Sequence, residues 1–160
     1  MQAILKNEVP TMITLTRTNS ENKDFQRLVT ALDKDLAIKN GTMNDFFVQF
    51  NKIDLINNVV IAVSNNEAAG CGAMKKYSPS TMEIKRMFVP VEMRGKGIAV
   101  AVLTELENWA RELGYEKCIL ETGNNMPEPI GLYKKCGYHI IPNYGQYEMV
   151  ESSVCFEKYL

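Results

Sequence analysis

The segment at residues 89–103, VPVEMRGKGIAVAVL, places two cations and two glycines where an apolar helical pattern begins. Arg94 and Lys96 supply positive charge, while Gly95 and Gly97 allow a ligand to approach the backbone closely. The first four N–H groups of a helix have no partner within the helix and lie at the positive end of its dipole, so a helix start binds phosphate. The tetrapeptide RGKG alone is consistent with an anion site and equally with an exposed turn.

The elements on either side provide the arrangement that phosphate binding needs. Residues 81–89 alternate in polarity like a strand, the stretch from Gly97 to Gly114 has the apolar spacing of a helix, and residues 117–122 are expected to form the next strand. Such a strand–helix–strand unit favours a right-handed parallel crossover. The alternation assigns the side chains of the strand at residues 81–89 to two faces. Met82, Ile84, Arg86 and Phe88 are expected on one face, and Glu83, Lys85, Met87 and Val89 on the other.

The rest of the chain is expected to complete a mixed sheet with helices on its faces. We expect a single α/β (α+β) domain over residues 1–160. The further strands are predicted at residues 12–18, 59–64, 68–77, 138–142 and 153–159, and the further helices from the cap residues Asn19 and Ser20 to Asn40-Gly41, over 44–53 and over 127–137.

Composition narrows the class of protein. Hydrophobic residues make up 46% and charged residues 23% of the chain, as in soluble globular domains, and the net charge of −1 argues against nucleic-acid binding. The four cysteines form no C-x-x-C pair and His139 is the single histidine, so we expect no metal site, and thiols buried in a reducing compartment. No apolar run approaches the ~20 residues of a membrane span and no signal peptide is recognisable, so we expect a cytoplasmic protein without membrane contact.

Two motifs in order resemble the GNAT superfamily of acetyl-CoA-dependent N-acetyltransferases. Residues 94–99, RGKGIA, fit the family signature Arg/Gln-x-x-Gly-x-Gly/Ala, and IGLYKKCGYHIIP at 130–142 fits its Leu-Tyr followed by a Gly-aromatic pair. The resemblance covers most of the chain from Thr14 and is strongest over residues 81–160. It implies a mostly antiparallel sheet of six to seven strands with about four helices. Its parallel pair, here 82–89 and 117–121, would splay to form the cofactor cleft.

The resemblance implies contacts to acetyl-CoA residue by residue. Strand backbone would bind the pantetheine arm, the glycine turn would bind the pyrophosphate, and Tyr133 matches the tyrosine that protonates the thiolate leaving group. The family often carries asparagine seven residues before this tyrosine; here Met126 stands there, and Asn124 or Asn125 is the expected substitute. The expected cofactor-binding residues are Met87, Phe88, Val89, Arg94, Gly95, Lys96, Gly97, Ile98, Ala99, Asn125 and Tyr133.

Glu83 is the expected catalytic base, directly or through water. An amine with a pKa near ~10 must lose a proton before it attacks the thioester, and a carboxylate can take that proton. The alternative is a solvated strand glutamate that pairs with Lys75 or Lys85. The expected substrate-binding residues on the acceptor side are Glu83, Phe46, Tyr144 and Tyr147; the alternative for the aromatic residues is a place in surface loops.

These expectations lead to an N-acetyltransferase that modifies a primary amine of a small molecule or protein, with acetyl-CoA as cosubstrate. Two alternatives stay open: a catalytically idle acyl-CoA-binding or sensory module of the same fold, and an interaction domain without a cofactor. The strands near the C-terminus, including SVCFEKYL at 153–160, allow a homodimer contact.

Overall fold

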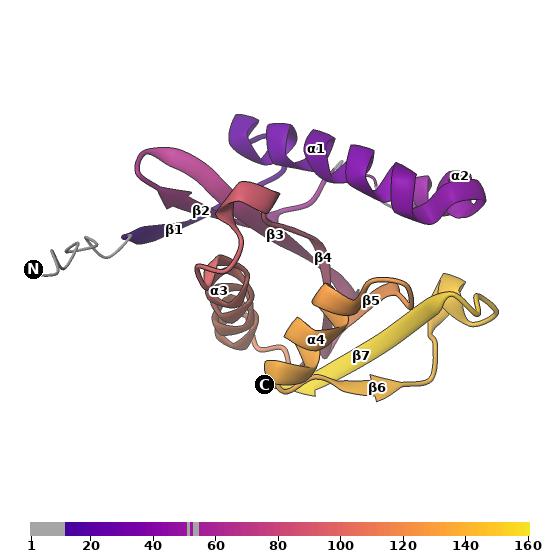
Figure 1. Cartoon of the computed structure of the whole chain (residues 1–160). Coiled ribbons are helices and arrows are strands. Elements are labelled where there is room, and N and C mark those ends of the chain that lie inside the picture. Colours follow the sequence, from indigo (N-terminus) through magenta and orange to yellow (C-terminus); the bar gives the residue numbers. More distant parts are fainter. Residues whose placement is uncertain (1–11, 51, 53–54) are drawn as a thin grey trace, which may run out of the picture.

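Seven strands form one mixed sheet in the computed structural model, which describes residues 12–50, 52 and 55–160 (Figure 1). The sheet order is β1-β2-β3-β4-β5-β7-β6, and the only parallel pair within the described residues is β4–β5. The predicted fold class is therefore confirmed. The strands are β1 (Ile13–Thr18), β2 (Asn58–Ser64), β3 (Glu67–Ser78), β4 (Thr81–Phe88), β5 (Lys117–Gly123), β6 (His139–Ile141) and β7 (Ser153–Tyr159).

Helices cover both faces of this sheet (Figure 1). One buried cluster joins the sheet to α1, and a second, larger cluster joins it to α3 and α4. Among the described helices, none is long and apolar enough to cross a membrane. The α-helices are α1 (Lys23–Asn40), α2 (Asn44–Val48), α3 (Ile98–Glu112) and α4 (Pro127–Lys135), and the short 3₁₀ turns are η1 (Gly41–Met43), η2 (Val91–Met93) and η3 (Gly145–Tyr147).

The start of α1 differs from the prediction. Asn22 is the N-cap, and its side-chain oxygen accepts a 2.9 Å hydrogen bond from the backbone N–H of Phe25. Asn19 instead accepts a hydrogen bond from the N–H of Glu21, in the turn before the helix. The prediction of Asn19 and Ser20 as caps was wrong because several residues here have capping side chains, and only the position of the buried Phe25 selects Asn22. The predicted end at Gly41 is confirmed.

The second helix is shorter than predicted. The prediction covered residues 44–53, whereas α2 ends at Val48 and a turn follows. Residues 51 and 53, at the far end of the predicted helix, lie outside the described residues.

A bulge at Arg86 changes the direction of the side chains along β4. Arg86 has φ 57°, and the pairing with β3 shifts there, since Ala73 faces Lys85 but Cys71 faces Phe88. The extra residue reverses the alternation. Met87 and Val89 therefore pack on the α3 face together with Met82 and Ile84, while Phe88 packs on the α1 face. The predicted sides were wrong from Arg86 onward, because a strict two-residue period does not allow for a bulge.

The two parallel strands separate soon after they begin. β4 and β5 pair at Thr81, Met82 and Glu83, which face Lys117, Cys118 and Ile119. In the described chain no further pairs join these strands, although β4 continues to Phe88 and β5 to Gly123. The predicted splayed pair is present, and it leaves one edge of β4 free of β5.

Three of the four cysteines are buried within the sheet, as the sequence indicated. Cys71, Cys118 and Cys155 are fully buried, and Cys136 is partly buried. Burial raises the pKa of Cys71 and Cys118 to about 12 and that of Cys155 to about 11. These thiols therefore stay protonated at neutral pH and act as small apolar side chains.

Candidate active site

A cavity of about 560 Å³ lies where β4 and β5 separate. Its walls come from β4, β5, the C-terminal half of α1, the start of α3, and α4. The cavity therefore reaches both helical faces of the sheet through the gap between the strands. A cavity of this volume is typical of small-molecule binding sites.

The open edge of β4 forms one wall of the cavity. Met87, Phe88 and Val89 all line it, beyond the last pair with β5. An extended chain with amide groups can hydrogen-bond to such an edge, as peptides do when they add a strand to a sheet. The carbonyl oxygen of Val89 already accepts a 2.9 Å hydrogen bond from Nε of Arg94, which places this guanidinium at the cavity wall.

The start of α3 has the backbone geometry that the predicted anion site requires. Gly95 and Gly97 have φ values of 76° and 77°, a conformation that other residues rarely adopt, and Gly97 is the N-cap of α3. No side chain caps this helix start. Its first N–H groups are therefore free of a side-chain partner, and Gly97, Ile98 and Ala99 all line the cavity. Lys96 is exposed and does not line the cavity.

Arg94 crosses the cavity opening from the α3 side to α4. Its Nη1 lies 3.5 Å from a carboxylate oxygen of Glu128, whose side chain is 78% exposed. An ion pair at this level of exposure contributes little stability. Arg94 is therefore available to exchange this partner for a ligand phosphate.

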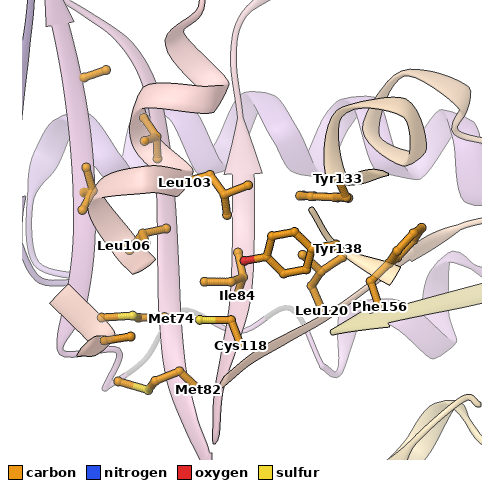
Figure 2. Close-up of a cluster of buried hydrophobic side chains, with 14 of the residues drawn as sticks. Met74, Met82, Ile84, Leu103, Leu106, Cys118, Leu120, Tyr133, Tyr138 and Phe156 are labelled. Carbon is orange, nitrogen blue, oxygen red and sulfur yellow. The ribbon is translucent and has the colours of Figure 1, made fainter. Parts of the chain in front are cut away.

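Tyr133 is the one buried residue of α4, and it lines the cavity. Its ring packs edge-on against Tyr138, with centroids 5.8 Å apart, and at a tilt against Phe156 at 6.0 Å. Figure 2 shows these three rings together between the sheet and the helices. Burial raises the pKa of Tyr133 above its ordinary value, so its hydroxyl is a proton donor at neutral pH.

Glu83 lies on the α1 face of β4 and is 8% exposed. Its Oε2 accepts a 2.7 Å hydrogen bond from the Tyr144 hydroxyl, and its Oε1 lies 3.5 Å from Nζ of Lys85. The contact with Lys85 is the one that the alternative interpretation predicted. Glu83 is nevertheless buried and lines the cavity, so it is not a solvated surface glutamate.

Glu121 of β5 is a candidate that the sequence interpretation missed. It lines the same cavity, and burial raises its pKa to about 7, with the Glu83 carboxylate adding to the rise. A carboxyl group that titrates near neutral pH is suited to proton transfer. The available signal was the single acidic residue of KCILETG, which directly follows the apolar residues CIL on the strand expected to form the cleft.

The predicted acceptor-side aromatic residues gather around the two glutamates. Tyr147 lines the cavity, and Tyr144 packs edge-on against it at 5.8 Å while its hydroxyl contacts Glu83. In α2, Phe47 lines the cavity and Phe46 packs behind it at 5.2 Å. The structure thus brings the predicted residues together, with Phe47 rather than Phe46 at the cavity surface.

Asn125 makes a different contact from the one expected. Its side-chain amide donates a 3.1 Å hydrogen bond to the carbonyl oxygen of Lys39, at the end of α1. It does not line the cavity, whereas the neighbouring Met126 does. The asparagine therefore joins α1 to the loop after β5.

Comparison of the sequence with known proteins identifies a family and several relatives of this chain. The family model described as Acetyltransferase (GNAT) family matches residues 25–138, more than half of the chain. An uncharacterised N-acetyltransferase of Bacillus subtilis is 35% identical over 101 residues, which cover 62% of this chain and 67% of that protein. An IAA acetyltransferase of Azospirillum brasilense is 33% identical over 100 residues, covering 62% of this chain and 65% of that protein. The matched part is thus about two thirds of each relative.

Solved structures share the whole fold. A candidate acyl-CoA N-acyltransferase from Klebsiella pneumoniae superposes with a TM-score of 0.77 at 27% identity, over 93% of this chain and 98% of that one. A GNAT family acetyltransferase from Elizabethkingia anophelis, solved with acetyl-CoA bound, has a TM-score of 0.68 at 20% identity, over 92% and 98% of the chains. The family match, the shared fold and the splayed strands agree, and the chain belongs to the GNAT family of acetyltransferases.

Proposed function

We propose that this protein transfers an acetyl group from acetyl-CoA to a primary amine of a small molecule or protein by direct attack of the amine on the thioester. The observation that carries the proposal is the convergence of three features on one cavity: an open strand edge, an uncapped helix start, and buried ionisable side chains. The ionisable groups are Glu83, Glu121 and Tyr133.

The donor side of the cavity fits acetyl-CoA, which supplies an activated thioester when bound. Backbone groups of Met87 and Phe88 bind the amides of the pantetheine arm, and the first N–H groups of α3 bind the pyrophosphate. Arg94 pairs with the phosphate charge at the cavity opening. This division follows the order of the lining residues, from the free edge of β4 to the glycine turn.

A backbone N–H near Met87 polarises the thioester carbonyl and stabilises the oxyanion that forms on attack. Removal of one such donor typically raises the barrier by about 3 kcal/mol. The bulge at Arg86 immediately precedes this group, and it changes the course of β4 at the site of reaction.

Proton transfer completes the reaction at two sites in the cavity. On the acceptor side, a carboxylate, Glu83 or Glu121, takes a proton from the amine directly or through water. The new N–C bond forms as the carbonyl becomes the oxyanion, and the C–S bond breaks when the oxyanion collapses back to a carbonyl. On the donor side, the Tyr133 hydroxyl gives its proton to the departing thiolate and is reprotonated from solvent.

The experiment is a measurement of free CoA thiol with acetyl-CoA and a panel of primary amines. We expect amine-dependent release by the unchanged protein, and about a ten-fold or greater fall in kcat for Tyr133→Phe, which removes only the hydroxyl. Glu83→Gln is expected to lower kcat for the amine without a large change in the KM for acetyl-CoA. Full activity in both variants would show that these roles are wrong.

The same experiment separates the idle-module and cofactor-free alternatives. An idle acyl-CoA-binding module melts at a higher temperature with acetyl-CoA but releases no thiol with any amine. An interaction domain shows neither effect. A ligand present at ~100 times its Kd stabilises the folded state by about 2.7 kcal/mol, so binding is measurable as a shift in Tm.

A further inference from the structure

An ion pair outside the cavity lining joins the buried Glu107 to Lys158, whose side chain is 25% exposed. Glu107 of α3 is 3% exposed and accepts two hydrogen bonds. The Tyr138 hydroxyl donates to Oε2 at 2.8 Å, and Nζ of Lys158 donates to Oε1 at 2.9 Å. Each carboxylate oxygen of Glu107 therefore has its own partner, and both partners come from the C-terminal third of the chain.

The two partners of Glu107 belong to the two walls that hold the Tyr133 ring. Tyr138 packs edge-on against that ring, and its backbone N–H donates a 3.0 Å hydrogen bond to the carbonyl oxygen of Tyr133. Lys158 lies on β7 two residues after Phe156, the second ring in contact with Tyr133. Residues two apart on a strand share a face, so the position of Lys158 is tied to that of Phe156. Figure 2 shows Tyr138 and Phe156 on adjacent sides of Tyr133.

Stability alone is a poor reason for this arrangement. Burial of an ion pair costs several kcal/mol for each ion, and well-packed apolar residues often stabilise a fold as much or more. A fully satisfied polar network instead selects one orientation of its members. Burial raises the pKa of Tyr138 well above its ordinary value, so its hydroxyl stays protonated and continues to donate to Glu107.

The two aromatic contacts of the Tyr133 ring come from outside its own helix. α4 has nine residues, and Tyr133 is the only one of them that is buried. Tyr138 and Phe156 are thus the aromatic neighbours that limit the direction of the Tyr133 hydroxyl. In catalysis, misplacement by ~1 Å of a group that has to meet a reacting atom can cost about 10²-fold in rate.

We infer that Glu107 is a positioning residue that holds the Tyr133 hydroxyl in the cavity through Tyr138 and Lys158. The inference rests on the proposed acid role of Tyr133. Glu107 lies on the same helix whose first turn forms the anion site, so α3 fixes the phosphate-binding end of the donor site and, through Glu107, the acid at its other end.

The test is a double-mutant cycle on kcat with Tyr138→Phe, which removes only the hydroxyl that contacts Glu107. With Tyr133 present, we expect kcat to fall about ten-fold, equivalent to about 1.4 kcal/mol, while the KM for acetyl-CoA changes less than two-fold. With Tyr133→Phe in place, we expect Tyr138→Phe to cause no further fall. A structural effect on the domain as a whole would lower kcat equally in both backgrounds.

The matched control is Tyr115→Phe, at a partly buried tyrosine in the same core cluster, which is expected to leave kcat unchanged. If Tyr138→Phe unfolds the protein, Lys158→Met removes the other donor to Glu107 and takes its place in the cycle. Glu107→Gln keeps an acceptor oxygen for Lys158, and its amide can donate to the Tyr138 hydroxyl instead of accepting from it, so we expect kcat to stay within about three-fold of the unchanged protein.

Two results would overturn the inference: an equal fall in kcat in both backgrounds, or no fall in either. Failure of the proposed function appears separately, in Tyr133→Phe alone. If that single variant keeps full activity, the acid role is wrong before Tyr138 is changed. If it loses activity and the cycle is additive, the acid role stands and the positioning role of Glu107 is wrong.

Discussion

The Tyr144 hydroxyl donates a 2.7 Å hydrogen bond to Oε2 of Glu83, across 61 residues of sequence. Burial raises the pKa of Tyr144 above its ordinary value, so the phenol stays protonated and the contact persists at neutral pH. Lys85 lies 3.5 Å from the other oxygen. Glu83 is thus held in one orientation from both sides, which is what a base or an amine-binding carboxylate requires.

We expect Tyr144→Phe to lower kcat/KM for the amine by about ten-fold or more, because a hydrogen bond to a charged group contributes about 1.5–3 kcal/mol. The KM for acetyl-CoA should stay unchanged, since Tyr144 is not on the donor side. Steady-state kinetics with each substrate varied in turn measures both. Tyr159→Phe, at an exposed tyrosine, is the control. An unchanged kcat/KM for the amine would exclude a role for this contact.

Glu121 predicts a pH dependence of stability. Its pKa is about 7 in the folded protein against a reference value of 4.5, so between these values the folded state keeps a proton that the unfolded chain has released. The retained proton of Glu121 therefore makes its full contribution to the free energy of unfolding below pH 4.5. This contribution falls as the pH rises and is lost above about pH 7.

We expect Glu121→Gln to remove this dependence. Relative to the unchanged protein, the variant should gain about 1–3 kcal/mol in unfolding free energy between pH 4.5 and pH 8. Urea unfolding of both proteins across this range measures the difference. Parallel curves would mean that the carboxyl of Glu121 titrates normally.

The bulge in β4 predicts which of two variants at Arg86 is the more stable. Arg86 is 6% exposed, has φ 57° and pairs with Asp33 of α1. Both Arg86→Ala and Arg86→Gly remove the ion pair, but only glycine adopts this backbone conformation without strain. We expect Arg86→Gly to be more stable than Arg86→Ala by about 1–2 kcal/mol, measured by urea unfolding. The reverse order would exclude backbone strain at Arg86.

We expect Gly97→Ala to lower both the stability of the protein and its affinity for acetyl-CoA. Alanine at Gly97 meets no neighbour within 4 Å, so the cost of Gly97→Ala comes from its φ of 77°, about 1–2 kcal/mol. A change in this turn also moves the first N–H groups of α3. We therefore expect a smaller shift in Tm with acetyl-CoA than for the unchanged protein.

Gly131→Ala is the matched control for Gly97→Ala. Gly131 is also free of neighbours within 4 Å, but it lies inside α4 and is not among the residues with positive φ. Alanine there should raise the unfolding free energy by about 0.5–1 kcal/mol. Equal effects at the two glycines would rule out the conformational argument.

The parts of the site that the sequence predicted are the parts built from local chemistry. The proposed anion site needs glycines directly before a helix, and Tyr133 lies in a contiguous motif, so both candidates are recognisable from neighbouring residues. The bulge at Arg86 has no such signal, because it places a residue other than glycine at positive φ. The raised pKa of Glu121 comes from burial in a cavity whose walls also include α1 and α4, and no pattern of neighbouring residues reveals that burial.

The most direct test of the account is mass-spectrometric detection of the N-acetylated amine, formed from isotopically labelled acetyl-CoA by the unchanged protein, Glu83→Gln and Tyr133→Phe. We expect labelled product from at least one primary amine with the unchanged protein, and product formation about ten-fold or more slower with Tyr133→Phe. Labelled product at equal rates from all three proteins, or from none of them with any amine, would contradict it.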